Sequence, residues 1–229
     1  MRRARILLVN GNCRVELTDR MVTLAETKLG NLADIEAMTI STVPRFIANA
    51  KDADAAAPEI HKAVCARVLD TSRLQPDAVM LACFGEPGLW ALRNSLPIPV
   101  TGMAEASAAT ALQLGRQFSI LVSGQEWPAA ISDLMAVYGM DRRCARITAV
   151  PDPAMAEDPA IWKPALEAAL TQEAIFGDVG IVILGGGPLA GRAGALSSPP
   201  GMRVLDAFDT TLLQTFALAL ATRTKQDGV

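Results

Sequence analysis

The chain has 229 residues, of which 51% are hydrophobic, 20% charged and 4% aromatic, and its formal net charge at pH 7 is -3. This length allows one large domain or two small ones, and the absence of a basic cluster argues against a nucleic-acid partner. No apolar run approaches the ~20 residues that cross a bilayer, and the short run ILLV near the start ends in Asn-Gly-Asn, unlike a signal peptide. We therefore expect a cytoplasmic protein without a membrane partner.

Short apolar runs alternate with longer amphipathic or alanine-rich stretches in the first part of the chain. The predicted elements are a strand at 4–10, a helix at 15–30, a strand at 33–40, a helix at 56–70, a strand at 77–83, a helix at 87–96, a strand at 98–102 and a helix at 103–115. The strand at 77–83 is apolar on both faces, as in a parallel sheet. The helix at 87–96 has Pro87 in its first turn, which is typical of a helix start.

The second part of the chain repeats this order. The predicted elements are a strand at 117–123, a helix at 127–139, a strand at 144–150, a helix at 159–175, a strand at 179–185, a strand at 203–208 and a helix at 209–223. Pro164 is expected to kink the helix at 159–175 or to delay its start. The alternation predicts an α/β fold with mainly parallel sheets flanked by helices.

The glycine turns LACFGEPG and ILGGGPLAG follow matching strands, which suggests two similar lobes. We predict a first lobe of residues 1–97 plus 207–229 and a second lobe of residues 98–206. Ligands of open α/β sheets bind beyond the carboxyl ends of the strands, so the active site is expected in a cleft between the lobes. The groups at these ends are Asn10, Asn12, Cys83–Glu86, Ser123, Gly124 and Gly185–Gly187.

Cys83 has two interpretations. A thiol where a strand ends and a helix begins would face unpaired backbone N–H groups and the positive end of the helix dipole. These would lower its pKa from ~8.5 and make it a base or a nucleophile, while the N–H groups of Phe84 and Gly85 would hold a carboxylate or enolate oxygen. The alternative is a buried cysteine that only fills core space.

The remaining cysteines point to packing rather than chemistry. Cys13, Cys65 and Cys144 have no metal-ligand spacing and should be free thiols in a reducing compartment, although Cys13 follows the first strand and could line the cleft. The single histidine, His61, lies in a predicted helix. No histidine general base and no histidine-ligated metal is therefore expected.

Two glycine-containing turns have both a binding and a conformational interpretation. Gly185–Gly187 could wrap an anion with backbone N–H groups or allow a tight turn with positive φ, and their spacing fits neither GxGxxG nor a P-loop. Asn10 and Asn12 flank Gly11, and they either form a turn or hold a carboxylate or ureido group of a substrate.

Several segments, taken together, resemble one family over nearly the whole chain. They are Asn10-Gly11-Asn12-Cys13 with Thr18 (family pattern N-P-N-S/T), Pro44-Arg45-Phe46-Ile47 (G-P-x-x-I), ACFGEPGLWALR with Glu86 for Asp (A-C-F-G-D-P-G-L), and the stretch from Ile98 to Leu121 (IPV-x-G-x-A-E-A). The sequence resembles the Asp/Glu/hydantoin racemase superfamily, and within it the hydantoin and allantoin racemase branch.

This resemblance implies an enzyme that needs no cofactor: neither a metal nor pyridoxal phosphate. Two cysteines face each other across the α-carbon of the substrate, and one removes the proton that the other replaces. The first cysteine corresponds to Cys83. The second falls in an L-G-C-A-G-M pattern, where this chain has Gly186. A glycine cannot transfer a proton, so the symmetric two-thiol reaction lacks one partner.

The leading hypothesis is an isomerase or racemase that acts by cysteine acid/base chemistry on a small carboxylate- or hydantoin-like substrate. Cys83 would be the catalytic residue; the predicted substrate-binding residues are Asn10, Asn12, Phe84, Gly85, Ser123, Gly124, Gly186 and Gly187. The alternatives are a one-cysteine lyase or decarboxylase similar to arylmalonate decarboxylase, a hydrolase with Cys83 as nucleophile, and a ligand-binding pseudoenzyme. The resemblance also implies a homo-oligomer.

Overall fold

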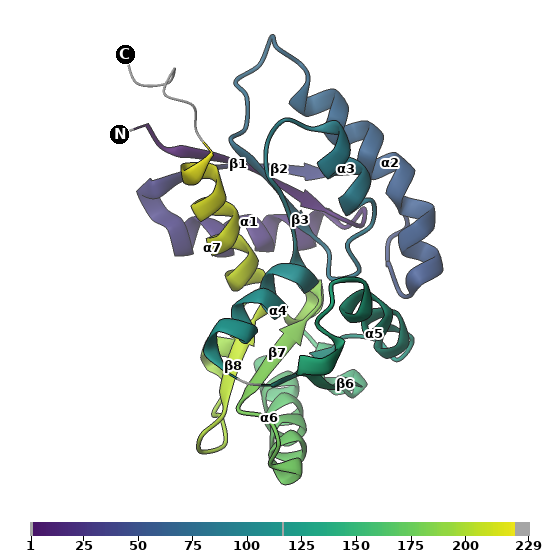
Figure 1. Cartoon of the computed structure of the whole chain (residues 1–229), viewed down its shortest axis with the longest axis vertical. Coiled ribbons are helices and arrows are strands. Elements are labelled where there is room, and N and C mark those ends of the chain that lie inside the picture. The colour runs from purple at the N-terminus through teal and green to yellow at the C-terminus, as the bar shows by residue number, and fades with distance from the viewer. Residues whose placement is uncertain (1, 116, 223–229) are drawn as a thin grey trace. The chain divides into compact units, whose positions relative to one another are not determined.

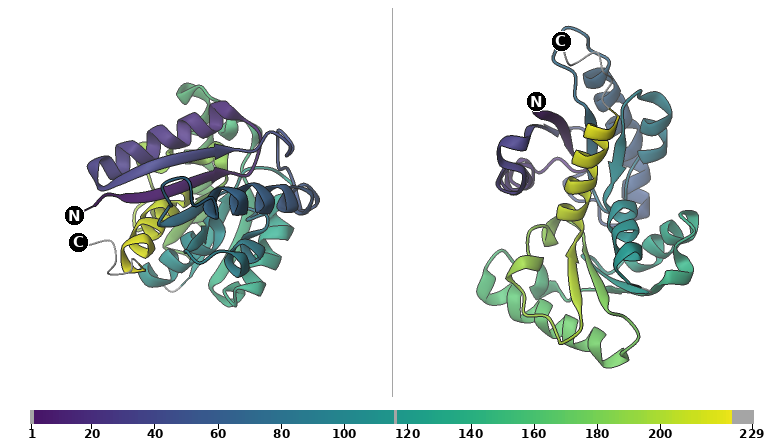
Figure 2. Two further views of the ribbon diagram at one scale, coloured as in Figure 1. Left: turned by 90° about the horizontal axis from the view of Figure 1, so that it is seen from above. Right: turned by 60° about the vertical axis from the view of Figure 1, so that its left-hand side comes forward.

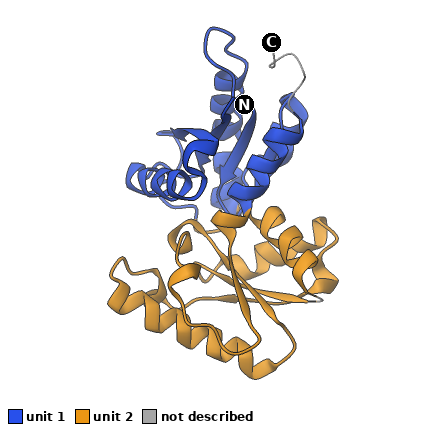
Figure 3. Ribbon diagram, turned by 90° about the vertical axis from the view of Figure 1, so that its left-hand side faces the viewer, with its two compact units in different colours: residues 1–47, 51–102, 211–229 blue, residues 48–50, 103–210 orange. Residues whose placement is uncertain are grey.

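Two four-stranded parallel sheets, one in each of two units, organise the protein (Figure 3). The computed structural model describes residues 2–115 and 117–222. Unit 1 comprises Met1–Ile47, Lys51–Gly102 and Thr211–Val229, and unit 2 comprises Ala48–Ala50 and Met103–Thr210. The units differ from the predicted lobes at residues 48–50, 98–102 and 207–210. Residues 1 and 223–229 of the predicted first lobe and residue 116 of the second lie outside the described residues.

The sheet of unit 1 has the strand order β2-β1-β3-β4, with every pair parallel. Strands β1, β2 and β3 are labelled in Figure 1. Its strands are β1 (Ala4–Asn10), β2 (Ala33–Thr39), β3 (Ala78–Ala82) and β4 (Val100–Gly102). All of β3 is buried, as its apolar residues on both faces predict. Because β4 pairs with β3, residues 100–102 belong to unit 1.

Helices cover both faces of this sheet. α1 (Val15–Leu29) runs along one side and α2 (Ala50–Val68) along the other (Figure 2, left). α2 and the short α3 (Leu89–Ser95) contribute Ile60, Val64, Val68, Leu89 and Leu92 to one apolar cluster with Leu7, Val9, Val79 and Leu81 of the sheet. α2 begins six residues before the predicted position.

Unit 2 repeats the topology of unit 1, with the strand order β6-β5-β7-β8 and parallel pairing throughout. Its strands are β5 (Phe118–Val122), β6 (Cys144–Ala149), β7 (Ile181–Gly185) and β8 (Arg203–Asp206). The remaining helices are α4 (Met103–Leu114), α5 (Trp127–Val137), α6 (Pro159–Phe176), α7 (Ala207–Ala221) and 3-10 turns at Gly30–Leu32, Asp141–Arg143, Asp152–Met155, Gly187–Leu189 and Ala193–Ala195. The expected α/β class with parallel sheets is confirmed.

Side-chain caps set the starts of α6 and α7; α6 starts at the predicted residue 159, whereas α7 starts two residues before the predicted residue 209. Pro164 does not delay α6, because Asp158 accepts a hydrogen bond from Ala160 N at 2.8 Å and starts the helix at Pro159. Strand β8 ends at Asp206 rather than at residue 208, because the Asp206 carboxylate accepts from Phe208 N at 3.0 Å and starts α7. Burial, with a contribution from the charge of Asp209, raises the pKa of Asp206 to about 6.

Among residues 2–115 and 117–222, no helix combines the length and the apolar character needed to cross a membrane.

Candidate active site

The predicted site residues of unit 1 meet where β1 and β3 end. The chain leaves β1 toward β2 on one side, while β3 lies on the other side, so these two strands flank the point where the strand order reverses. Asn10, the last residue of β1, pairs with Ala82, the last residue of β3. The residues that follow them, Gly11 and Cys83, lie against each other. Open α/β sheets bind ligands at such a reversal.

Cys83 is partly exposed and packs directly against the backbone of Gly11. A Cβ atom on Gly11 would lie 2.6 Å from Cys83 Cβ and 2.9 Å from Cys83 Sγ. Real Cβ atoms do not approach other carbons this closely, so only glycine at position 11 allows the thiol its present place. Both interpretations of Cys83 stay predictions, because the residue is partly exposed while its thiol is surrounded closely enough for burial to raise its pKa.

We expect Gly11→Ala to move the Cys83 thiol, because the added methyl group overlaps it. The substitution should reduce any Cys83-dependent activity about tenfold or more, since misplacing a reacting group by ~1 Å costs up to ~10²-fold. Turnover and alkylation of Cys83 would be measured in parallel with Gly194→Ala, where an added Cβ meets no atom within 4 Å. Equal activity in the two variants would contradict the prediction.

The predicted lowering of the Cys83 pKa is wrong. Burial raises the pKa of the Cys83 thiol to about 11, the backbone N–H groups of Gly85 and Glu86 act in the opposite direction, and the Glu86 carboxylate adds to the increase. α3 begins only at Leu89, after Gly88 in the left-handed conformation (φ 76°), so Cys83 lies outside the first turn, to which a helix dipole effect is confined. The thiol is therefore protonated at neutral pH.

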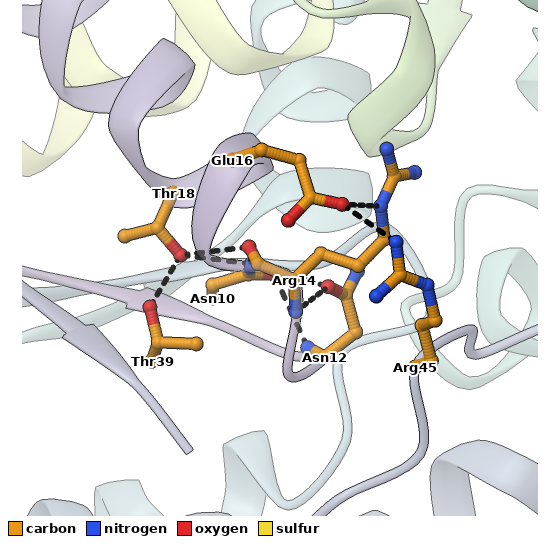
Figure 4. A network of polar contacts seen from close by, with 7 residues as sticks. All are labelled: Asn10, Asn12, Arg14, Glu16, Thr18, Thr39 and Arg45. Carbon is orange, nitrogen blue, oxygen red and sulfur yellow. Dashed lines mark hydrogen bonds and ion pairs between the residues drawn. The ribbon is translucent and has the colours of Figure 1, made fainter. Parts of the chain in front are cut away.

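Asn10 and Asn12 form an internal polar network at the start of α1 (Figure 4). Asn10 is 1% exposed, and its Nδ2 lies 3.0 Å from both Arg14 O and Thr18 Oγ1, while its Oδ1 accepts from Asn12 N at 3.1 Å. Asn12 Oδ1 accepts from Arg14 N at 3.0 Å. These contacts favour the turn interpretation for Asn10. Asn12, which is partly exposed, stays a predicted substrate ligand.

The sequence analysis did not predict a cluster of ion pairs beside this turn. Glu16 Oε1 accepts from Arg14 Nε and from Arg45 Nη2, each at 3.0 Å (Figure 4), and both guanidinium groups lie within 6 Å of the centre of the Phe46 ring. The Arg14 side chain lowers the pKa of Glu16. Glu16 and Arg45 are largely exposed. We therefore assign this cluster a structural role, which is to hold the segment around residue 45 against α1.

In unit 2 the predicted residues also meet at neighbouring strand ends. Val122 pairs with Gly185, and Ser123 N donates to Gly185 O at 3.1 Å. Gly186 has φ 120° and ψ 147°, and a Cβ atom there would overlap Ser123 Oγ and lie 3.2 Å from Ser123 Cβ. The conformation of Gly186 supports the tight-turn interpretation of the three glycines, and the Ser123 hydroxyl fills the space that a side chain at 186 would need.

Gly124 and Gly187 complete this edge of unit 2. Gly124 has φ 106°, and a Cβ atom there would lie 3.1 Å from Trp127 Cδ1. Gly187 begins a 3-10 turn, in which its carbonyl accepts from Ala190 N at 3.2 Å. The structure therefore gathers the predicted residues into one group in each unit.

Glu86, in unit 1, was named among the strand-end groups but was not included among the predicted catalytic and substrate-binding residues. It is 5% exposed and has a left-handed backbone with φ 53°. Its position three residues after Cys83 was visible in the sequence, but its burial was not, because a Gly-Glu-Pro-Gly segment is typical of an exposed turn.

Together these features define a duplicated α/β protein with a partly exposed cysteine residue in a strand-end loop. A family model described as Asp/Glu/Hydantoin racemase matches residues 6–215. The chain belongs to the Asp/Glu/hydantoin racemase family, and the resemblance found in the sequence is confirmed.

Individual relatives support this assignment. The chain is 28% identical to a hydantoin racemase of Rhizobium meliloti over 144 residues, which are 62% of this chain and 60% of the relative. It is 28% identical over 204 residues to a hydantoin racemase of Paenarthrobacter aurescens, covering 88% and 85% of the two chains. The crystal structure of an allantoin racemase from Pseudomonas fluorescens matches with a TM-score of 0.84 at 25% identity, covering 95% and 91%. The match to the Rhizobium protein thus spans less than two thirds of that protein.

Proposed function

We propose that this protein is a cofactor-independent enzyme of the racemase type, which moves a proton at the α-carbon of a small carboxylate- or hydantoin-like molecule. The observation that carries the proposal is the position of Cys83, a partly exposed residue, at the reversal between β1 and β3 in a chain of this family. The hydantoin and allantoin racemases among its relatives support the substrate class.

Cys83 is the proposed acid and base. Its thiolate takes the α-proton, which leaves the electron pair of the C–H bond on the substrate as an enolate, and the thiol then returns a proton to the carbon. In this proposal the backbone amides of Phe84 and Gly85 stabilise the developing negative charge. Asn12 binds the substrate, whereas Asn10 fixes the turn that positions Asn12.

We propose that Ser123, Gly124, Gly186 and Gly187 of unit 2 bind substrate, and that Gly186 stands where related racemases have a second cysteine. Without that thiol, proton removal and return both use Cys83, so the favoured reaction on a bound enantiomer is exchange of its α-hydrogen. The Ser123 hydroxyl is the side-chain polar group that lies against Gly186.

A one-cysteine decarboxylase is the second candidate. It is favoured by the raised pKa of Cys83, because a thiol that is protonated at neutral pH can deliver its proton to the enolate left after CO₂ departs. A cysteine hydrolase is the third candidate; its nucleophile would be the Cys83 thiolate, which the proton-removal step of the leading proposal also needs.

Isotope exchange in D₂O tests these proposals. The protein is incubated with each enantiomer of candidate hydantoins and amino acids, and with malonates, and α-deuterium, optical rotation and CO₂ release are measured. Exchange with retained configuration supports one-thiol chemistry, exchange with loss of rotation supports racemisation, and CO₂ release supports the decarboxylase. Binding without any of these, seen as a ligand-dependent rise in Tm, would overturn the enzymatic proposal in favour of a ligand-binding pseudoenzyme.

We further propose a cytoplasmic protein that takes a small-molecule substrate and forms a homo-oligomer. Catalysis by a free thiol requires a compartment that keeps cysteine reduced, which supports the location. Light scattering of the purified protein would test the oligomer.

A further inference from the structure

A hollow of about 500 Å³ lies in unit 1, toward the amino-terminal edge of the sheet. The residues that line it come from β1 and β2, from the last turn of α2 and from the segment between α2 and β3, and they include Arg5, Asp34, Glu36, Arg67, Arg73 and Leu74. Cys83 follows the carboxyl end of β3, and parallel strands all begin at one edge of a sheet and end at the other. The hollow is therefore separate from Cys83 and the candidate site around it.

Arg67 brings a buried charge to this hollow. It is 6% exposed, and a buried guanidinium group needs acceptors for its N–H groups. Nε and Nη2 of Arg67 donate to the two carboxylate oxygens of Glu36 at 2.6 and 2.5 Å, and Nη2 also donates to Leu74 O at 2.7 Å. Within the described part of the chain, the third nitrogen, Nη1, is buried and has no hydrogen-bond partner. The fold thus fixes the Arg67 side chain and still leaves donors that no described residue satisfies.

The lining carries more positive than negative charge. Arg5, Arg67 and Arg73 contribute three guanidinium groups, whereas Asp34 and Glu36 contribute two carboxylates, which leaves an excess of one positive charge. Glu36 serves two of the arginines, because its Oε1 also accepts from Arg73 Nη2 at 3.1 Å. An anion bound in the hollow would remove this imbalance.

The equivalent place in unit 2 has the opposite balance. In the repeated topology β6 takes the position of β2, and α6 takes that of α2. There Arg146 of β6 forms ion pairs with Glu173 of α6 at 3.0 Å and with Asp178 at 2.7 Å, so that two carboxylates meet one guanidinium group. An ion pair between the edge strand and this helix is thus common to both units, but the surplus of arginine belongs to unit 1.

We propose that this hollow binds a small organic carboxylate that has an apolar portion. Guanidinium groups bind carboxylates through paired N–H donors, which Arg67 Nη1 and Arg73 supply. Leu74 is 71% exposed and offers an apolar surface to the rest of the ligand, and the volume lies within the ~300–1,000 Å³ typical of small-molecule sites. Because Nη1 is covered, the segment with Arg73 and Leu74 must shift slightly to admit the carboxylate, and the exposure of both side chains allows this movement.

Isothermal titration of the full chain with 4-phenylbutanoate tests the proposal, and it needs no turnover, so it is independent of the proposed function. Its amide, 4-phenylbutanamide, has the same shape without the charge, and inorganic phosphate has charge without an apolar portion. The carboxylate should bind at least about tenfold more tightly than either, because hydrogen bonds to a charged group are the stronger ones. Bound 4-phenylbutanoate should also slow hydrogen exchange in residues 69–76. Absence of binding, tighter binding of phosphate or of the amide, or protection confined to residues 83–89 would overturn the proposal.

Substitutions of the arginines locate the site. Arg73 lies at the surface, with its side chain 55% exposed, and Arg73→Gln leaves the charges of the lining balanced; it should weaken 4-phenylbutanoate binding about tenfold and leave the amide unaffected. Arg67→Lys keeps the charge but lacks the forked donors of the guanidinium group, and it should weaken binding similarly. The matched control is Arg142→Gln, which removes one charge from an exposed position of unit 2 and should leave the Kd unchanged. Equal affinities in Arg73→Gln and Arg142→Gln would leave the arginines of unit 1 with a structural role only and overturn the proposal.

Discussion

Cys83→Ala is expected to lower α-hydrogen exchange or decarboxylation by at least about 10²-fold, because general acid–base catalysis typically contributes 10²–10⁴-fold and the proposed chemistry has no second thiol. Cys83→Ser should be nearly as inactive, since a hydroxyl group is a much weaker acid than a thiol. Each variant would be assayed for deuterium incorporation at saturating substrate, so that a loss of turnover is distinguished from weaker binding.

The matched control for this prediction is Cys65→Ala. Cys65 is a partly buried cysteine of the same unit, with its Sγ 3.5 Å from His61 Nε2 on α2, and it has no part in the proposed reaction. Its substitution should leave turnover unchanged. Full activity in Cys83→Ala, with thermal unfolding similar to that of the control, would exclude an acid/base role for Cys83.

The position of the candidate site could be predicted from the sequence because it follows from topology. The apolar runs define the strands, and in a parallel sheet the residue after each strand lies at the same edge. Asn10 and Cys83 were therefore predicted at the carboxyl ends of their strands, and the structure shows that these strands, β1 and β3, are paired. The duplication was also visible, since both halves show the same order of strands and glycine turns.

The electrostatics of Cys83 could not be predicted in this way. The sequence predicted a helix from residue 87, but left-handed residues at Glu86 and Gly88 extend the turn, and α3 begins at Leu89. The pKa of a thiol depends on how many atoms surround it, and that number is set by contacts between distant segments, such as that between Gly11 and Cys83. The buried carboxylate of Glu86 was missed for the same reason.

Gly186 shows why aligning a motif does not by itself predict what a substitution does. The resemblance places Gly186 at the position of the second cysteine, where Gly186→Cys would add a thiol. In the structure, Gly186 has φ 120° and ψ 147°, a conformation that is essentially restricted to glycine, and the place of a Cβ atom is filled by the Ser123 hydroxyl. We therefore expect Gly186→Cys to destabilise the protein and to confer no efficient two-thiol racemisation.

The expected cost has two separable parts. Gly186→Ala should lower the free energy of unfolding by about 1–3 kcal/mol through backbone strain and by a further ~1–3 kcal/mol through overlap with Ser123. Adding Ser123→Gly should recover the second part but not the first, which a double-mutant cycle in urea would measure as a coupling between the two sites. Gly180→Ala is the control, because its Cβ atom would meet only Gly201 O at 3.6 Å. A Gly186→Cys protein that is as stable as this control and racemises its substrate would contradict the prediction. It would show that the turn can adopt another conformation and that the glycine at position 186 does no more than remove the second thiol.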